Sequence, residues 1–447
     1  MTNQTSANFP PGPKLYVPLF FMQRLYQDPF KVLLQLARKY GSAIHISAHG
    51  RHGFAFGDPY YIHAVFTTHQ YAFQKNSVPQ RAKILLGNGL INSDGELHRR
   101  QRHNIIPALH RQYTQGYAAT IISSAQQITE TWQDRLAINI SQEMTRLSLT
   151  IICRTLLSDS LVPQWREIDQ SLRTMLENYN ALGIITFTGL LDTFILPLRR
   201  RRDRALAQLD QMVYDVIELA RGDRNQAHSV VCQLLDAQSG DDIMNDKLLR
   251  DEIVTLLLAG YETTSIVLAW SWLLIAQHPH VMRQFLSEID TVLQGRLPTP
   301  EDLPNLQYTD MIFTEVLRMY PPVWAISRYA REDVHIGKYL IPSQSIVVLS
   351  QYLAHHNPAI FPNPDQFDPD RWRPEIRATY PNGAYFPFGG GAAKCIAESF
   401  AHMEGVLALA TIAQRWHLEP IMTGKMPLKT ALTLRPKYDI VMQARRR

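Results

Sequence analysis

Residues 388–397 read FGGGAAKCIA, a glycine-rich loop that ends in a cysteine at position 395. Apolar residues recur at helical spacing behind it, which predicts a helix from about Ile396 to Trp416. The positive end of a helix dipole and loop N–H groups directed at the sulfur both favour the thiolate, the form that binds metal. Glycine lacks a Cβ and tolerates positive φ, so this loop can approach a flat cofactor closely. A lone cysteine is also commonly a small buried hydrophobic residue, and that interpretation needs no cofactor.

The spacing of Phe388, Gly391 and Cys395 resembles the haem-binding loop of the cytochrome P-450 family, the haem-thiolate monooxygenases. In that family the cysteine is the proximal iron ligand, and the thiolate favours O–O cleavage. The resemblance therefore implies a haem b whose iron is bound by Cys395, with Phe388, Gly389 and Lys394 around the porphyrin.

The loop departs from the family pattern at two positions. Ala393 stands where the family commonly has arginine, and Ala397 stands where it commonly has glycine. The first change removes a partner for a haem propionate, and the second adds a methyl group beside the porphyrin. Both leave the iron ligand in place.

Composition places the chain among ordinary globular proteins. Its 447 residues are 45% hydrophobic and 19% charged, enough for a core that encloses a cofactor. The net charge of +5 favours an acidic protein partner or peripheral contact with an anionic membrane. No zinc-finger spacing or heptad-linked basic region indicates nucleic acid. Three widely separated cysteines suit a reducing compartment, and we expect a cytoplasmic, soluble protein without signal peptide or membrane anchor.

The order of patterns along the chain predicts a mainly α fold with a small β portion (α+β), the cytochrome P-450 fold. We expect one domain over residues 1–447, with 1–14 as an irregular lead-in. Helices are predicted at Pro29–Tyr40, over most of 95–224 with breaks near Pro163 and 183–197, and over 246–320; strands are predicted within 43–56 and 334–353 and near 432–434 and 440–442; and 354–391 is an irregular proline-rich segment.

The segment from Ile253 to Ala276 is almost continuously apolar. Glu262 lies at its middle, where a bilayer would impose a cost of roughly 2.5–3.5 kcal/mol. We therefore expect a long core helix. Inside it, the Thr263 hydroxyl can bond back to the Ala259 carbonyl, and Gly260 leaves space where a side chain would stand, so the helix opens locally. An ordinary core helix explains these residues as well, but they resemble the oxygen-activation motif of the family. That resemblance implies Thr263 and Glu262 as the catalytic pair, with Ala259 over the haem.

Glu315 and Arg318 lie three residues apart on a predicted helix that stops before Pro321. Such a pair is usually a solvated surface contact worth about 0.2–0.5 kcal/mol. In the family, the matching pair locks onto an arginine further along, here Arg371 in the sequence FDPDRW. The resemblance implies that these three residues have a structural role, which is to fix the proline-rich segment that carries the cysteine loop.

His98 and Arg102 are one helical turn apart and can reach the same anion. A solvated basic helix face is the simpler interpretation. The resemblance implies that both bind haem propionates, and that Arg328 and His355 also approach them.

The family builds its substrate pocket from four segments, which here are 84–91, 181–191, 256–259 and 323–326. Nearly all of their residues are apolar, so we expect a fatty acid, a terpenoid or a similar lipid. The candidate lining residues are Leu86, Ile91, Ile185, Leu256, Ala259, Ala325 and Ile326.

The resemblance implies a monooxygenase that hydroxylates this substrate with O2. Electrons would come from a separate donor, a ferredoxin with its reductase or a flavodoxin-type protein, because no reductase segment follows. Its docking face would be basic and include Arg99, Arg100, Arg102, His103, Arg111 and Lys394. Three alternatives stay open: a peroxygenase or isomerase-type relative, a non-catalytic haem sensor or carrier, and a helical scaffold without haem.

Overall fold

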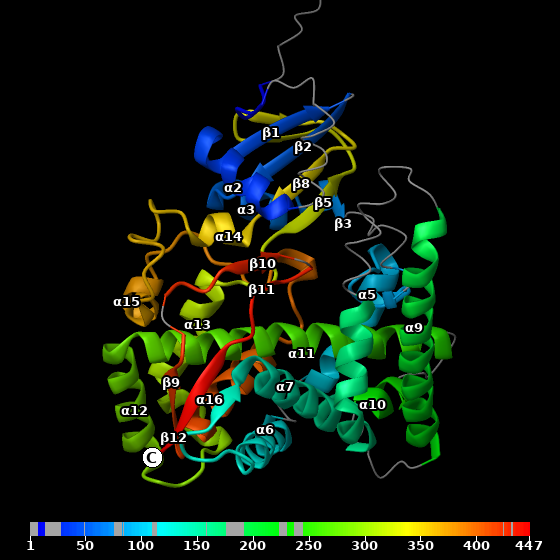
Figure 1. The fold of residues 1–447 in the computed structure, drawn as a ribbon. Helices are drawn as coiled ribbons and strands as arrows, with labels where there is room; N and C mark the ends of the chain where they lie inside the picture. Colours follow the sequence, from blue (N-terminus) through cyan, green and yellow to red (C-terminus); the bar gives the residue numbers. More distant parts are fainter. Residues whose placement is uncertain are drawn as a thin grey trace, which may run out of the picture.

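The structure is a computed structural model of the chain. It describes residues 8–13, 28–48, 50–75, 83, 85–109, 114–157, 159–175, 192–222, 230–236, 245–422, 424–430 and 432–447. This part of the chain forms mainly helices with a few small sheets, as the sequence predicts (Figure 1).

The helices lie mostly in the middle of the chain. They are α2 Pro29–Tyr40, α3 Pro59–Phe66, α5 Gly95–Ile105, α6 Thr114–Thr129, α7 Ile140–Leu156, α9 Asp192–Gly222, α10 Val230–Asp236, α11 Asp246–Gln277, α12 Pro279–Leu293, α13 Gln307–Met319, α14 Gln351–His355, α15 Pro374–Arg377 and α16 Glu398–Ala413.

The strands come mainly from the two ends of the chain. They are β1 Ala43–Ala48, β2 Arg51–Phe56, β3 Phe73–Lys75, β4 Ala137–Asn139, β5 Ile326–Ala330, β6 Val334–Ile336, β7 Tyr339–Ile341, β8 Ile346–Leu349, β9 Trp416–Pro420, β10 Leu428–Thr430, β11 Leu434–Pro436 and β12 Val441–Arg446. The five-stranded sheet has the order β1-β2-β8-β5-β3, and its β2–β8 pairing is parallel, with Phe54 opposite Val347. It lies at one end of the molecule, with most helices at the other (Figure 1).

Helix α11 crosses the whole helical part (Figure 1). It begins where the Asn245 side chain accepts a hydrogen bond from the Leu248 N–H at 2.9 Å. Its flanks pack on α7, α13 and α16, and the Trp270 ring stacks on Tyr320 with centroids 4.0 Å apart. Among the described residues it is the one helix long and apolar enough to cross a bilayer, but 83% of its apolar stretch is buried inside the protein. The prediction of a core helix is therefore confirmed.

The described part of the lead-in, residues 8–13, packs against the sheet. The Phe9 ring stacks on His45 with centroids 4.5 Å apart, and the His45 N–H donates to the Pro11 carbonyl at 3.2 Å. A Cβ at position 12 would lie 1.7 Å from the His45 carbonyl oxygen, so only glycine fits there. The segment is irregular, as predicted, and it is held by these contacts.

Some predicted boundaries agree with the structure and others do not: helix α15 lies in the segment predicted to be irregular, and strand β9 begins at Trp416, the predicted last residue of a helix. Helix α2 has the predicted limits, and α13 stops one residue before Tyr320. The break predicted over 183–197 is wrong in its second half, because α9 begins at Asp192 and includes Pro197 in its first turns, where proline is tolerated best. The helix behind the cysteine begins at Glu398 instead of Ile396. Residues 395–397 instead close the preceding loop.

Glu404 is an uncompensated polar group in the middle of α16. The residue is completely buried, and neither carboxyl oxygen makes a hydrogen bond of good geometry within the described part of the chain. Burial raises the pKa of Glu404 to about 8, opposed only by the nearby Ser148 hydroxyl. The carboxyl group is therefore neutral at pH 7 in the folded protein, whereas an unfolded chain would ionise it.

Substitution Glu404→Gln should stabilise the protein increasingly as pH rises. Because the pKa of Glu404 is raised, the folded protein holds this proton more tightly than the unfolded chain. The resulting contribution to the free energy of unfolding is complete below the usual pKa of glutamate and is lost as pH rises to about 8. Over that window wild type should lose roughly 3–5 kcal/mol of unfolding free energy that the variant keeps. Urea unfolding at pH 5 and pH 9 measures the difference. The exposed Glu130→Gln serves as the control, and an equal gain at both pH values would contradict the prediction.

Candidate functional site

The loop before α16 closes on itself and presents the Cys395 thiol. The Cys395 N–H donates to the Phe388 carbonyl at 2.9 Å, and the Ala397 N–H points at Sγ at 3.4 Å. The Gly389 N–H donates to the Phe386 carbonyl at 2.9 Å, and Gly389 has φ of 73°. The sulfur thus lies at the end of a tight backbone turn and accepts a backbone hydrogen bond.

Two properties of Cys395 look contradictory. The residue has accessible surface, yet burial is the largest influence on its pKa and raises it, against the Ala397 N–H and the charges of Arg102 and Lys394. Both hold if the thiol faces a hollow inside the protein instead of bulk water. The Ala397 N–H favours the thiolate, as expected, but desolvation is the larger influence, and a metal cation on the sulfur would favour the anion further.

Two of the loop glycines serve a purpose other than approach to a cofactor. A Cβ on Gly390 would lie 2.8 Å from the Phe66 ring, and one on Gly391 would lie 2.3 Å from the Phe66 carbonyl oxygen. These positions must be glycine because the loop packs directly on the end of α3. Gly391 also has a φ of 65°, which other residues rarely adopt.

Helix α11 is buried along most of its length and opens at one place. From Asp251 to Ile275 only Ala259, Gly260 and Thr263 are more than slightly exposed. The Thr263 hydroxyl donates to the Ala259 carbonyl at 2.7 Å, as predicted. Gly260 does not create the opening, however, because a Cβ there would meet Ile152 of α7 at 2.5 Å. The lack of a side chain at Gly260 lets α7 pack closely against α11. The small side chains of Ala259 and Thr263 leave the surface of α11 bare.

Glu262 lies on a different face of α11 from Thr263. Its Oε1 accepts a hydrogen bond from the Thr433 hydroxyl at 2.9 Å. Burial raises the pKa of Glu262, opposed by Thr433 and by the charges of Arg435 and Arg173. Glu262, Arg173 and Arg435 border a small cavity of about 60 Å³, whose wall also includes the exposed Tyr438 and Asp439. The carboxyl group therefore has a polar connection toward solvent.

A cluster of cations lies beside the cysteine loop. The Arg102 guanidinium donates to the Lys394 carbonyl at 2.6 Å and interacts with the charge of Cys395. Lys75, Arg102 and Arg328 together lower the pKa of the nearby His98 to about 4, after burial, which is the largest cause. None of these three cations forms an ion pair with a carboxylate of the described residues.

This cluster is where the haem implied by the resemblance can be tested against the structure. Half-buried cations without carboxylate partners are costly unless an anion joins them. Burial lowers the pKa of Lys75 to about 8 and also lowers that of Arg328, with Asp94 as the acid that opposes both shifts. The two propionates of a haem would supply the missing negative charge. The residues present fit the group, and Lys75 lies near His98, Arg102 and Arg328, for which the resemblance implies contact with propionates.

The expectation that His355 approaches a propionate is corrected by its position in the structure. Its ring is completely buried, and its Nε2 accepts the Phe386 N–H at 3.0 Å. A ring without accessible surface is enclosed by protein atoms on every side. His355 therefore stabilises the backbone before the cysteine loop and does not face a propionate. Phe388 and Gly389 are half-exposed, and the Lys394 ammonium pairs with Glu398, so Lys394 contributes to the site through its carbonyl.

Glu315 holds four groups at once. Its two oxygens accept Arg318 Nε and Nη2, each at 2.8 Å, in a bidentate pair. They also accept Trp372 Nε1 at 2.8 Å and the Asp368 N–H at 3.1 Å. Arg371 Nε lies 3.4 Å from Oε1. The Glu315 and Arg318 side chains are fully buried, so the alternative of a solvated surface pair is excluded.

Only some of the residues predicted to line the substrate pocket have exposed side chains. Ile91 and Ala259 are exposed, and Ala325 and Ile326 are half-exposed. Leu86 and Leu256 are buried in the main core and contribute little surface. Ile185 lies outside the described residues, as does Arg111 of the predicted docking face.

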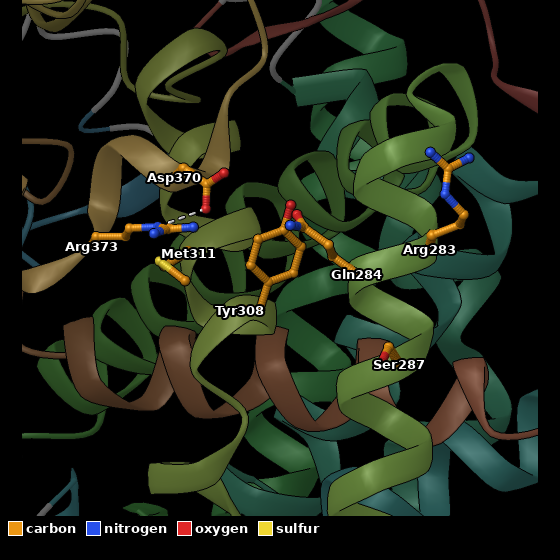
Figure 2. A pocket seen from close by; sticks show the side chains of 7 residues that line it. All are labelled: Arg283, Gln284, Ser287, Tyr308, Met311, Asp370 and Arg373. Atoms are coloured by element: carbon orange, nitrogen blue, oxygen red, sulfur yellow. Dashed lines mark hydrogen bonds and ion pairs between the residues drawn. The ribbon is translucent and has the colours of Figure 1, made fainter.

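A wider hollow of about 450 Å³ exists elsewhere, on the outer surface between α12, α13 and Pro369–Trp372. Figure 2 shows Arg373 paired with Asp370 at one side of this hollow and Arg283 at the other. Its lining contains neither the thiol nor any residue of the cation cluster.

Sequence reasoning missed Lys75, Arg173, Thr433 and Arg435. Each comes from a segment far along the chain from the motif it joins, and a lone basic or hydroxyl residue carries no spacing signal. Only Lys75 had a local cue, because it is the last residue of a short strand next to an apolar loop.

Comparisons with known proteins agree with this site. A model of the cytochrome P-450 family matches residues 10–443. Cyclooctatin synthase of Streptomyces melanosporofaciens is 39% identical over 362 residues, which cover 80% of this chain and 78% of that protein. Pentalenene oxygenase of Streptomyces avermitilis is 32% identical over 354 residues, 78% of each chain. The crystal structure of the cytochrome P450DA heme domain superimposes with a TM-score of 0.88 at 26% identity, covering 99% of this chain and 98% of that one.

The thiol loop, the cations beside it and the shared fold therefore lead to one conclusion: the chain belongs to the cytochrome P-450 family and is a haem-dependent monooxygenase.

Proposed function

We propose that this enzyme inserts one oxygen atom from O2 into a terpenoid. Of the three substrate classes that the sequence left open, the terpenoid is favoured by the names of its relatives, which refer to cyclooctatin and pentalenene. The exposed apolar surface of Ile91, Ala259 and Ile326 suits a hydrocarbon skeleton, and no cation lies among these three residues. The observation that carries the proposal is the Cys395 thiol next to cations that have no carboxylate partner among the described residues.

We propose that the cofactor is haem b. Cys395 would bind its iron, and Lys75, His98, Arg102 and Arg328 would hold its propionates. When bound, haem supplies the activation of O2 and the oxidation of a C–H bond. The chain supplies the space for both molecules, because the bare surface of Ala259 and Thr263 leaves room beside α11 for a flat ring and for a substrate.

Proton delivery falls to Glu262 and Thr263 in this proposal. The Thr263 hydroxyl donates its hydrogen bond to the Ala259 carbonyl. Its oxygen can therefore accept a proton or a hydrogen bond on the open side of α11. Glu262 has a raised pKa and keeps its proton at a higher pH than a glutamate in water. The small polar cavity with Arg173, Arg435 and Asp439 would bring protons to it from solvent.

The electron donor would be a separate acidic protein such as a ferredoxin or flavodoxin. Helix α5 lies against the cysteine loop through Arg102 and exposes Arg99, Arg100 and His103. Cytoplasmic location is consistent with three cysteines that are all free, two of them buried.

Charge reversal at Arg99 and Arg100 should slow reduction by an acidic ferredoxin at low salt, and raising the salt should shrink the difference from wild type. Stopped-flow reduction rates measure this, with the exposed Lys429→Glu as the control. Equal rates for wild type and the double variant at low salt would refute this docking face.

The purified protein should give a Soret band near the position typical of a thiolate-ligated ferrous carbon monoxide complex, and Cys395→Ser should lose it. Titration with cyclic terpenes should then shift the spin state of the ferric wild-type haem, and turnover should yield hydroxylated terpene. Fatty acids of similar length provide the comparison. A thiolate spectrum with response to fatty acids alone would disprove the terpenoid assignment, and a wild-type spectrum in Cys395→Ser would disprove the haem ligand.

Glu262→Gln should lower product formation by about 100-fold, the contribution typical of a positioned proton donor. The same variant should enlarge the solvent deuterium isotope effect on turnover. Thr433→Val keeps the carboxyl group and removes only its hydrogen bond, so its effect should be much smaller. Unchanged turnover and isotope effect in Glu262→Gln would exclude this residue from the proton path.

A further inference from the structure

The apolar loop at 85–92 is tied to the first turns of α11 by carboxylates. The Asn88 N–H donates to Asp251 Oδ2 at 2.9 Å, and the Leu90 N–H donates to Glu252 Oε2 at 3.0 Å. The partners are more than 160 residues apart in sequence. Each acidic side chain thus accepts one backbone N–H of the loop.

Cations complete the attachment from the other side. The Arg250 guanidinium donates to the Leu85 carbonyl at 2.7 Å and to Asp251 Oδ1 at 3.0 Å. The Lys75 ammonium donates to the Leu90 carbonyl at 2.8 Å. Two N–H groups of the loop, those of Asn88 and Leu90, therefore bond to acids, and two of its carbonyls, those of Leu85 and Leu90, bond to bases, all from elements outside the loop.

The loop also lies directly on the helix. A Cβ on Gly87 would lie 1.9 Å from Asp251 Oδ2, and a Cβ on Gly89 would lie 2.2 Å from Thr255 Oγ1. Larger residues at these positions would push the loop away from the carboxylates. Both glycines therefore serve the same attachment.

We propose that Asp251 and Glu252 are positioning residues that fix the 85–92 loop as one wall of the substrate pocket. They act through the loop backbone and do not touch the substrate. The inference rests on the proposed function in one respect, that Ile91 of this loop borders the substrate space, and it adds the residues that set the position of that wall.

The charges make this attachment strong. Hydrogen bonds from N–H groups to a carboxylate are roughly twice as strong as neutral ones. Asp251 and Glu252 are both buried, and Glu252 Oε1 has no hydrogen-bond partner within the described part of the chain. A buried carboxylate with one open oxygen depends heavily on the bond it does make. If that bond is lost, the Leu90 N–H and the acid would both be left unsatisfied.

The attachment should also respond to pH. Burial raises the pKa of Glu252 to about 7, opposed by the Leu90 N–H and by the Lys75 charge, while the Asp251 charge adds to the rise. The charged groups around it are therefore Asp251 and Arg250 on α11 and Lys75 on β3, with Asp94 acting on Lys75. Burial is the largest cause of the raised Glu252 pKa and detachment of the loop would relieve it, so ionisation of Glu252 favours the detached state and the attachment should weaken as pH rises through about 7.

Amide hydrogen exchange on the haem-loaded protein tests the attachment without any substrate. In Glu252→Ala, protection of the Leu90 amide should fall about 10- to 100-fold, the range expected for a hydrogen bond to a charged group. Glu252→Gln retains an acceptor and should restore most of that protection, but without the change near pH 7 seen in wild type. Glu404→Gln removes a different buried carboxyl group and should leave Leu90 unaffected.

Ligand binding tests the effect on the pocket. Imidazole is small, whereas 4-phenylimidazole needs room beside the haem, and both shift the Soret band. Glu252→Ala and Asp251→Asn should change the dissociation constant for 4-phenylimidazole severalfold more than that for imidazole. Equal changes for both ligands would indicate damage to the haem site and would overturn the positioning role.

The result is separable from the substrate assignment. Unchanged Leu90 protection in Glu252→Ala would overturn the inference even if terpenes are hydroxylated. Conversely, loss of protection with a selective effect on 4-phenylimidazole would support it even if terpenes prove inert. Should Glu252→Ala fail to fold, the pH series on wild type and Glu252→Gln decides: a step near pH 7 in wild type alone supports the inference, and two flat profiles overturn it.

Discussion

The Glu315 carboxylate is the contact on which the geometry of the site depends. It joins Arg318 on α13 to the irregular segment around Asp368 and Trp372, and that segment leads into the cysteine loop. A buried ion pair adds little stability relative to apolar packing, but removing one member leaves an uncompensated charge that costs about 3–5 kcal/mol. The backbone hydrogen bonds within the proline-rich segment close short local turns, and Glu315 with Arg318 ties those turns to α13. The position of Cys395 follows from this attachment.

Helix α11 performs different tasks on its different faces. Its first turns hold the 85–92 loop through Asp251 and Glu252, and its middle leaves Ala259 and Thr263 bare. On another face Glu262 meets Thr433 and a cavity that leads to solvent. A single rigid element thus fixes the distances between the attached loop, the open surface and the Glu262 carboxyl group. Because the helix is buried on nearly all sides, each of these polar groups needs a partner from a distant segment, and the structure supplies one.

The sequence predicted much of the fold because its periodicity is strong where the helices are long. The limits of α2 and the path of α11 followed from apolar spacing, capping residues and proline. The sequence prediction was less accurate near Cys395, where the helix begins at Glu398 instead of Ile396. There the loop closes onto the Phe388 carbonyl, and this closure overrides helical propensity. His355 was misassigned for a similar reason. A histidine in a motif can meet a propionate or a backbone N–H, and burial decides between them.

By itself, the sequence determined the chemistry available: one cysteine behind a glycine-rich loop, an acid and a hydroxyl adjacent on a helix, and a glutamate three residues before an arginine. These depend on local spacing, which the chain carries along its length. Only the tertiary structure decided how those groups are used. It set the pKa of Cys395 by burial, assigned Gly260 to α7 and Gly391 to Phe66, and brought Lys75 to the cation cluster. Desolvation and long-range contacts are properties of the packed molecule, so no window of sequence contains them.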